Sequence, residues 1–179
     1  MRADAQRNYD RLVAAARNVF AEQGADAPLD DIAQHAGVGN ATLYRHFPTR
    51  QALLEAVFRD HIDALCRQAD ELRSAASPGA ALKEWLGEVI AHGSAKRGLA
   101  ASLLAALGEE SSECRAAIFE AAQGLLTRAQ DAGEVRTDVS VGQVFKLVNA
   151  VALATETEPD AAAQAVSLLD LIFHGLATP

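Results

Sequence analysis

The sequence predicts an all-α protein, in which a three-helix head at the N-terminus is joined by a long helix to a larger helical body. The chain of 179 residues is rich in Ala and Leu and poor in Pro and aromatic residues, and this composition favours helix over strand. Apolar residues recur at the spacing of a helix face along most of its length. Gly and Pro residues fall between these stretches, where one helix ends and the next begins.

Three short helices are predicted within the first 50 residues. An apolar stripe predicts the first over residues 5–23. Pro28 begins the second helix at a position where its missing N–H costs nothing, and Gly37 ends it. The third helix is predicted over residues 40–46, because the residue before Pro48 is pushed out of the helical conformation.

The rest of the chain is predicted to form a body of longer helices. A helix over residues 50–72, capped by Thr49, is long enough to join the head to this body. The segment 74–79, rich in Ser, Ala, Pro and Gly, is the clearest break after it. We therefore divide the chain into a head, residues 1–50, and a body, residues 51–179. The remaining helices are predicted over residues 79–95, 99–107, 112–132, 141–155 and 160–176.

The last two predicted helices, 141–155 and 160–176, carry apolar side chains on every side. A helix without a polar face must be covered all round. In a domain of this size a second subunit is the expected cover. We therefore expect a homodimer that forms through these two helices.

Several classes of protein are disfavoured by the composition. No uncharged run approaches the ~20 residues needed to span a bilayer, and the N-terminus has no apolar secretion signal. Cys66 and Cys114 lie far apart, which argues against a disulfide framework or a zinc site and fits a reducing cytoplasm. The sequence has no catalytic or nucleotide-binding motif, and its five histidines lack metal-ligand spacing. We expect a cytoplasmic protein that is not an enzyme and holds no cofactor or metal.

Residues 32–54, IAQHAGVGNATLYRHFPTRQALL, form the most informative segment. Two short amphipathic helices are joined there by a glycine turn. Hydrogen-bonding side chains crowd the second helix, and a basic residue opens the helix that follows. This is the layout of a helix-turn-helix that reads duplex DNA.

The distribution of charge is compatible with that partner. The formal net charge is −8, but the first 50 residues hold six Arg and six acidic residues and are neutral. The body holds ten basic and eighteen acidic residues and accounts for the whole excess. A neutral head can bind phosphate if its few cations face one way. Its affinity would then depend on groove contacts, and its non-specific binding would be weak.

The segment AGVGNATLYRHFPTRQALL resembles the signature of the TetR family of bacterial repressors, which usually reads close to AGVSxGTLYxHFxSKxxLL. The match is specific and covers residues 8–58. Beyond it only the layout corresponds, a helical body that ends in two apolar helices. The resemblance implies a homodimer whose heads bind a palindromic operator and whose bodies bind a small-molecule effector.

The resemblance also implies roles for individual residues. Asn40 is expected to face a base, and the hydroxyls of Thr42 and Tyr44 are expected to hold phosphates. His46 would contact a phosphate or a base edge, and Arg50 would grip a phosphate from the start of the fourth helix. Between these contacts, Leu43 and Phe47 would pack inside the head. The full set of expected DNA contacts is Asn40, Ala41, Thr42, Tyr44, Arg45, His46 and Arg50.

Some of these positions have a plainer alternative. Arg45 could instead be a solvated or ion-paired surface residue. Tyr44 could instead be an aromatic residue of the core. Gly39 stands where the family commonly has Ser, which removes a cap of the third helix that Asn40 could replace. Pro28 stands where a Thr commonly touches phosphate, so that contact is expected to be lost.

An effector site in the body is implied only by the resemblance. Candidate residues combine apolar bulk with a polar group on stripes that face inward. For each of them an ordinary place in the helical core is the alternative. The candidates for effector binding are His61, Cys66, Trp85, His92, Phe119, Phe145 and Asn149.

Two hypotheses of different class remain. The first is a ligand-responsive repressor that binds a palindromic operator in double-stranded DNA as a homodimer, with no role at a membrane. The alternative is an all-helical small-molecule-binding or protein-interaction module with a non-operator role. The neutral charge of the head and the Pro at position 28 keep this alternative open.

Overall fold

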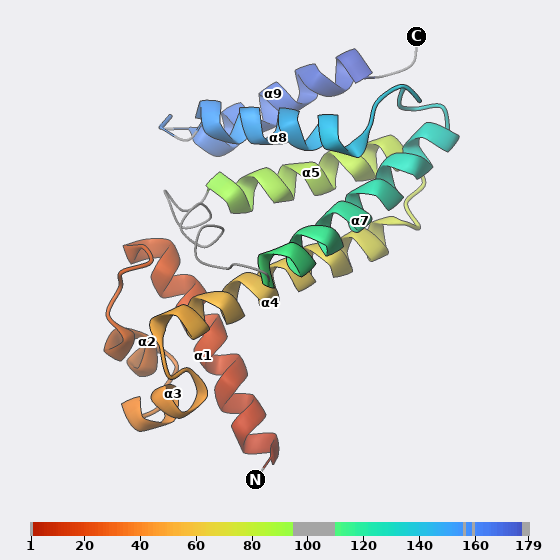
Figure 1. The fold of residues 1–179 in the computed structure, drawn as a ribbon. Helices are drawn as coiled ribbons and strands as arrows, with labels where there is room; N and C mark the ends of the chain where they lie inside the picture. The colour runs from red at the N-terminus through yellow and green to blue at the C-terminus, as the bar shows by residue number, and fades with distance from the viewer. Residues whose placement is uncertain (1, 95–109, 156, 159, 177–179) are drawn as a thin grey trace. The chain divides into compact units, whose positions relative to one another are not determined.

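The computed structural model describes residues 2–94, 110–155, 157–158 and 160–176 (Figure 1). Within these ranges every regular element is an α-helix, and the prediction of an all-α fold is confirmed. The chain divides into two compact units. Of the described residues, the first unit contains 2–61 and 110–111, and the second contains 62–94, 112–155, 157–158 and 160–176.

The first unit contains α1 (Arg2–Gln23), α2 (Leu29–His35), α3 (Asn40–His46) and the beginning of α4 (Arg50–Leu72). The predicted bounds of the third and fourth helices agree with α3 and α4, whereas α1 begins three residues earlier than predicted. One apolar cluster joins these helices. Its fully buried members are Leu12, Ala16, Phe20, Ile32, Leu43 and Leu53.

The turn between α2 and α3 depends on Gly37. This residue has a φ of +66°, a left-handed conformation that glycine adopts without steric cost. Its N–H donates to the carbonyl of Gln34 (3.0 Å), and the N–H of Val38 donates to the carbonyl of Ala33 (3.0 Å). These two bonds satisfy the last carbonyls of α2 and redirect the chain into α3.

The start of α4 belongs to the first unit. The side-chain hydroxyl of Thr49 accepts a hydrogen bond from the N–H of Ala52 (3.1 Å), which confirms the predicted cap. Leu53 and Val57 are then buried in the core of this unit. Along α4, the unit therefore extends to His61 rather than ending at residue 50, where the sequence places the boundary.

The second unit contains the rest of α4, followed by α5 (Pro78–Ser94), α7 (Glu110–Asp131) from Ser112 onward, α8 (Val141–Thr155) and α9 (Ala161–Leu176). The bounds of α8 are those predicted, and the other three differ from prediction by one or two residues at their ends. The predicted helix over 99–107 lies outside the described residues. Helices α5, α8 and α9 pack against one another (Figure 1).

The second unit has its own core. Trp85 of α5 is fully buried at its centre, among Leu82, Leu86 and Leu125. Its indole Nε1–H donates to the carbonyl of Leu65 in α4 (2.8 Å), so the one polar atom of the ring is satisfied. This bond links α4 to α5 within the unit.

A carboxylate closes the turn after α7. Glu134 Oε2 accepts hydrogen bonds from the hydroxyl of Ser77 and from the N–H of Gly79, both at 2.8 Å. Both donors lie at the N-terminal end of α5, where a negative charge is stabilised by the free N–H groups and the helix dipole. The turn between α7 and α8 is thereby held against the start of α5.

Helices α8 and α9 are only partly covered by their own chain. Val148 of α8 and Leu169 of α9 are buried in the core of the second unit. On their other sides, large apolar residues remain exposed to solvent. The exposed fractions are 38% for Leu147, 74% for Leu153, 55% for Val166 and 67% for Leu171.

None of the helices in the described part of the chain is both long enough and apolar enough to cross a membrane.

Candidate nucleic-acid interface

Helix α3 presents one polar face to solvent. Asn40, Ala41 and Arg45 are exposed, Tyr44 is 48% exposed, and Thr42 is half-buried. An amide, two hydroxyls and a guanidinium group therefore lie on seven consecutive residues of one short helix. The exposure of Tyr44 argues against the alternative of a core aromatic.

The opposite face of α3 anchors it to the first unit. Leu43 is fully buried and Phe47 is 3% exposed, which confirms both as core residues. The N–H of Phe47 still donates to the carbonyl of Leu43 (2.8 Å) as the helix ends. Burial of these two side chains fixes the rotation of α3 about its axis, and so determines which residues face outward.

Asn40 makes a contact that the sequence does not reveal. Its side-chain Nδ2–H donates to Oδ1 of Asp30, in the first turn of α2, at 2.7 Å. Gly39 occupies the N-cap position of α3, and no side chain caps this helix. The expectation that Asn40 could replace the missing cap is therefore wrong, because its amide is bonded across the turn to α2.

His46 is placed differently from the expectation. Its ring lies near Tyr9 and Phe47, with ring centroids 6.2 Å and 6.3 Å away. Its Nε2 atom is buried and has no hydrogen-bond partner among the described residues. His46 therefore packs beside Tyr9 and Phe47, and its expected contact with a phosphate or a base edge stays a prediction.

Arg50 is also engaged inside the first unit. Its guanidinium Nη1 donates to the carbonyl of Ala25 (2.9 Å) and to the carbonyl of Ala27. Both carbonyls belong to the loop between α1 and α2, and the contacts are partly buried. Arg50 therefore holds this loop against the start of α4 through Nη1, and the expected contact of its other guanidinium donors with phosphate stays a prediction.

Two other arginines of this unit are paired with acids. Arg7 forms an ion pair with Asp4 one turn away, and Arg17 of α1 lies 3.5 Å from Asp60 of α4. These pairs reduce the positive charge that α1 offers to a polyanion. Arg45 is left as the cation on the exposed face of α3 itself.

The structure places the residues expected to bind an effector in different surroundings. Trp85 is fully buried with its Nε1–H bonded, so it is a core residue. Asn149 is exposed on α8, because its side chain follows the face of α8 that the second unit leaves uncovered. His61 is the last residue of α4 in the first unit, and the side chain of His92 lies outside the described residues.

Three of the expected effector residues do lie in one region of the second unit. The rings of Phe119 in α7 and Phe145 in α8 are stacked, with centroids 4.3 Å apart and planes inclined by 19°. Cys66 of α4 is half-buried, and α7 residues Cys114 and Glu120 are close enough to act on it electrostatically. Burial raises the pKa of the Cys66 thiol, and nearby carboxylates, Asp63 first, raise it further. The thiol is therefore neutral and only weakly nucleophilic.

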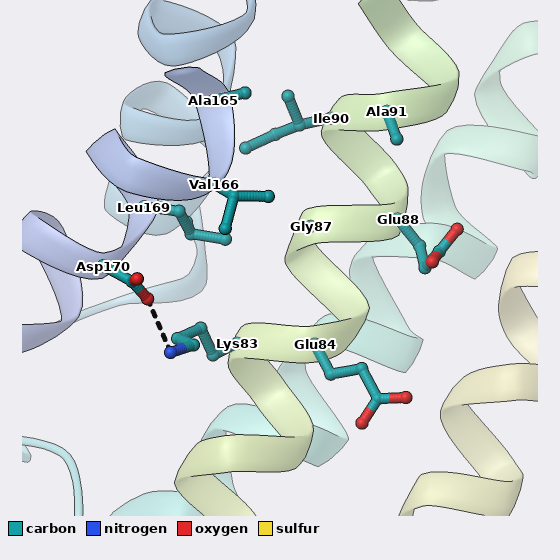
Figure 2. A pocket seen from close by; sticks show the side chains of 10 residues that line it. All are labelled: Lys83, Glu84, Gly87, Glu88, Ile90, Ala91, Ala165, Val166, Leu169 and Asp170. Atoms are coloured by element: carbon teal, nitrogen blue, oxygen red, sulfur yellow. Dashed lines mark ion pairs between the residues drawn. The ribbon is translucent and has the colours of Figure 1, made fainter. Parts of the chain in front are cut away.

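A groove that the sequence did not predict lies between α5 and α9 (Figure 2). It has a volume of about 240 Å³ and an apolar floor that includes Ile90 and Leu169. Lys83 Nζ lies 2.6 Å from Asp170 Oδ1 across its end, and Figure 2 shows this ion pair. None of the seven expected effector residues lines this groove. Its position depends on the pairing of α5 with α9, which no local sequence signal reports.

Among the described residues, no group of three or more His, Cys, Asp or Glu side chains is arranged to hold a metal ion.

A helix-turn-helix with a polar, exposed second helix, followed by a separate helical unit, defines a class of bacterial DNA-binding transcriptional regulators. Residues 12–57 match the model of the bacterial regulatory proteins of the tetR family. Residues 77–178 match the model described as "Transcriptional regulator SbtR-like, C-terminal domain". The chain therefore belongs to the TetR family and is a transcriptional regulator with a DNA-binding helix-turn-helix.

Solved structures of the family resemble the whole chain. The TetR transcriptional regulator SCO0520 from Streptomyces coelicolor is 39% identical, with a TM-score of 0.80 over 94% of this chain and 98% of its own. The TetR transcription regulatory protein from Mycobacterium vanbaalenii is 34% identical, with a TM-score of 0.77 over 99% of both chains. Both are transcriptional regulators, and the similarity extends through both units.

Curated relatives resemble about a third of the chain. The transcriptional repressor KstR2 of Mycolicibacterium smegmatis is 38% identical over 71 residues, which are 38% of this chain and 35% of the relative. The transcriptional activator FasR of the same organism is 41% identical over 56 residues, 31% of this chain and 26% of its own. The matches thus span about a third of these relatives or less. They are regulators of transcription and not enzymes, and one represses while the other activates.

Proposed function

We propose that the protein is a ligand-responsive transcriptional repressor that binds a palindromic operator as a homodimer. The observation that carries the proposal is the exposed polar face of α3, with Asn40, Tyr44 and Arg45 on it. A helix of this kind enters the major groove and reads bases with its N-terminal residues. Asn40 stands at that end, and an Asn amide matches the N6 and N7 edge of adenine.

The remaining groups of α3 have chemistry suited to the DNA backbone. The hydroxyls of Thr42 and Tyr44 can donate to phosphate oxygens, and Arg45 supplies a positive charge. Because Arg50 is used inside the first unit and Arg7 and Arg17 are paired with acids, few cations remain for phosphate. We therefore expect a shallow dependence of affinity on salt and weak non-specific binding.

Dimerisation is supported by the uncovered apolar residues of α8 and α9. Leu153 and Leu171 are more than half exposed, and large apolar side chains are stabilised by a cover that excludes water. A second copy of the same two helices would supply that cover in a closed, twofold interface. The dimer would then carry two copies of the first unit, one for each operator half-site. The two half-sites would lie about 34–36 Å apart.

We infer an effector site in the second unit at the stacked rings of Phe119 and Phe145. Cys66 lies within electrostatic reach of Glu120, the residue after Phe119. An apolar ligand that separates the two rings would shift α7 relative to α8. A ligand changes DNA binding only by the difference between its affinities for the two conformations, so this site requires such a rearrangement. Phe119→Ala should therefore reduce the response to an effector without changing operator selection.

The test is selection of genomic DNA fragments by the purified protein, beside the Tyr44→Ala/Arg45→Ala variant. Enrichment of a short palindrome by the wild type, and its loss in the variant, would support the proposal. Arg136→Ala is the matched control, because it removes an exposed arginine of the second unit that is paired with Asp138. No enrichment by folded, dimeric wild-type protein would favour the alternative of a module without an operator.

The sense of the regulation requires a second readout. The position of the enriched fragments relative to promoters, and transcription in a strain without the protein, distinguish repression from activation. Raised transcription of the adjacent genes in that strain would support a repressor. Lowered transcription would instead indicate an activator.

A further inference from the structure

Asp30 and Asn40 form a hydrogen-bonded pair on the surface of the helix-turn-helix. They are ten residues apart in sequence, with Asp30 in the first turn of α2 and Asn40 at the first position of α3. The bond runs from Asn40 Nδ2–H to Asp30 Oδ1 at 2.7 Å. Both side chains are exposed, so the pair faces solvent and not the core of the first unit.

The bond fixes which groups of Asn40 are left for a ligand. A side-chain amide has two N–H donors and one carbonyl acceptor. Asp30 takes one N–H, so one donor and the carbonyl oxygen remain. The bond also distinguishes the two ends of the amide, because a carboxylate accepts hydrogen bonds and cannot donate one. Asp30 therefore holds the carbonyl oxygen of Asn40 away from itself.

The pair as a whole is rich in acceptors. Asp30 contributes the free lone pairs of its carboxylate, and Asn40 contributes its carbonyl oxygen and one N–H. In the major groove, adenine presents the N6 donor beside the N7 acceptor, and cytosine presents the N4 donor. Guanine presents two acceptors, O6 and N7, and one of them would face the carbonyl oxygen of Asn40, which has no proton to donate. The charge and hydrogen-bonding groups of the pair thus complement bases with an exocyclic amino group in that groove.

We propose that Asp30 is a positioning residue for base recognition, and that the Asp30–Asn40 pair selects adenine or cytosine and rejects guanine at one position of each half-site. The inference rests on the proposed operator binding and specifies its chemistry. Asp30 also places a negative charge beside the expected path of the DNA backbone. It therefore lowers affinity for every sequence while it increases the difference between sequences, which is a mechanism of specificity by repulsion.

The experiment is selection from a randomised duplex library by the full-length protein and its variants, followed by titration of the selected duplex and its point variants. Asp30→Ala removes both the charge and the bond. Asp30→Asn removes the charge and keeps a group that can still accept from Asn40. Asp31→Ala is the matched control, since Asp31 has the same charge in the same helical turn of α2. Thermal unfolding of each variant verifies that it is folded.

The expected result is local to one position. Asp30→Ala should lose about tenfold in discrimination against guanine at a single position and its symmetry mate, a value within the range of one specific base contact. Its affinity for random duplex should rise at the same time, and preferences at other positions should stay as in the wild type. Asp31→Ala should keep the wild-type preference at every position.

A double variant of Asp30 and Asn40 distinguishes the positioning of Asn40 by Asp30 from a general effect of the Asp30 charge. In the double variant Asp30→Ala/Asn40→Ala, discrimination at this position should be no lower than with Asn40→Ala alone, because Asp30 acts through Asn40. Asp30→Asn should keep part of the preference and gain the affinity for random duplex.

Three outcomes would overturn the inference. An unchanged preference in Asp30→Ala, a loss spread evenly over all positions, or independent effects of the two substitutions would each contradict it. In these cases the wild type still selects an operator, so the proposed function stands. Failure of the folded wild type to select any sequence would overturn the proposed function and this inference together.

Discussion

Replacement of Leu171 by Asp should dissociate the proposed homodimer without unfolding the chain. Leu171 lies on α9 and exposes 67% of its surface in the single chain, so the core of the second unit does not depend on this side chain. A carboxylate at this position would be placed against the apolar residues of the second copy. Because a buried charge without a partner is strongly disfavoured, the dimer is expected to weaken and not to rearrange.

The magnitude follows from the exposed fraction. Full burial of a Leu side chain contributes about 1.5–3 kcal/mol, so covering the exposed two-thirds of Leu171 contributes about 1–2 kcal/mol. A twofold interface contains each residue twice, which gives about 2–4 kcal/mol for the pair. The dissociation constant of the dimer should therefore rise by roughly 30-fold to 1,000-fold from lost apolar burial alone.

The assay is sedimentation equilibrium over a range of concentrations, with thermal unfolding followed by circular dichroism. Ala116→Asp on the exposed face of α7 is the control for the addition of one acidic side chain. Leu169→Asp is a contrasting variant, because Leu169 is only 3% exposed and its replacement should unfold the second unit. A dissociation constant for Leu171→Asp within threefold of that of Ala116→Asp would refute the proposed interface.

Three further predictions concern side chains that form hydrogen bonds within the chain. Arg50→Ala should lower the free energy of unfolding by about 1–3 kcal/mol. The slope of log affinity for DNA against log salt concentration, measured by filter binding, should stay unchanged, and a slope smaller by one unit would show a phosphate contact instead. Trp85→Phe should cost about 1.5–3 kcal/mol in urea unfolding, from lost volume and the lost bond to Leu65, and a smaller cost would contradict a tightly packed core. Glu134→Ala should cost about 1–2 kcal/mol at the start of α5, with Glu134→Gln intermediate, whereas equal stability of both variants and wild type would exclude the capping role.

The helix-turn-helix was predicted well because its signals are local. Gly37 ends α2 through its left-handed conformation, and Thr49 caps α4 through its own hydroxyl. Leu43 and Phe47 are buried on one side of α3, as the helical spacing of apolar residues requires. Each of these features depends on residues within one or two helical turns, so the order of amino acids is sufficient to predict it.

The contacts of individual polar residues within the chain were not predicted, since they involve neighbours that are distant in sequence. Arg50 is bonded to carbonyls about 25 residues before it, and Asn40 is bonded to Asp30. His46 is packed near Tyr9 of α1. The sequence shows that these side chains can bind phosphate or bases. It does not show that these side chains already form hydrogen bonds or ring contacts with other groups of the same chain.

In the body, the sequence alone determined that α8 and α9 are rich in apolar residues and that they end where Gly, Pro and polar residues stand. Tertiary structure decided which of these apolar residues are buried within the single chain, and it buries Leu169 but leaves Leu171 exposed. It also left Asn149 exposed, buried Trp85 and opened a groove between α5 and α9. The hydrophobic effect is non-directional, so a sequence indicates how much apolar surface must be covered. Only the packing of helices against one another determines which residues cover it.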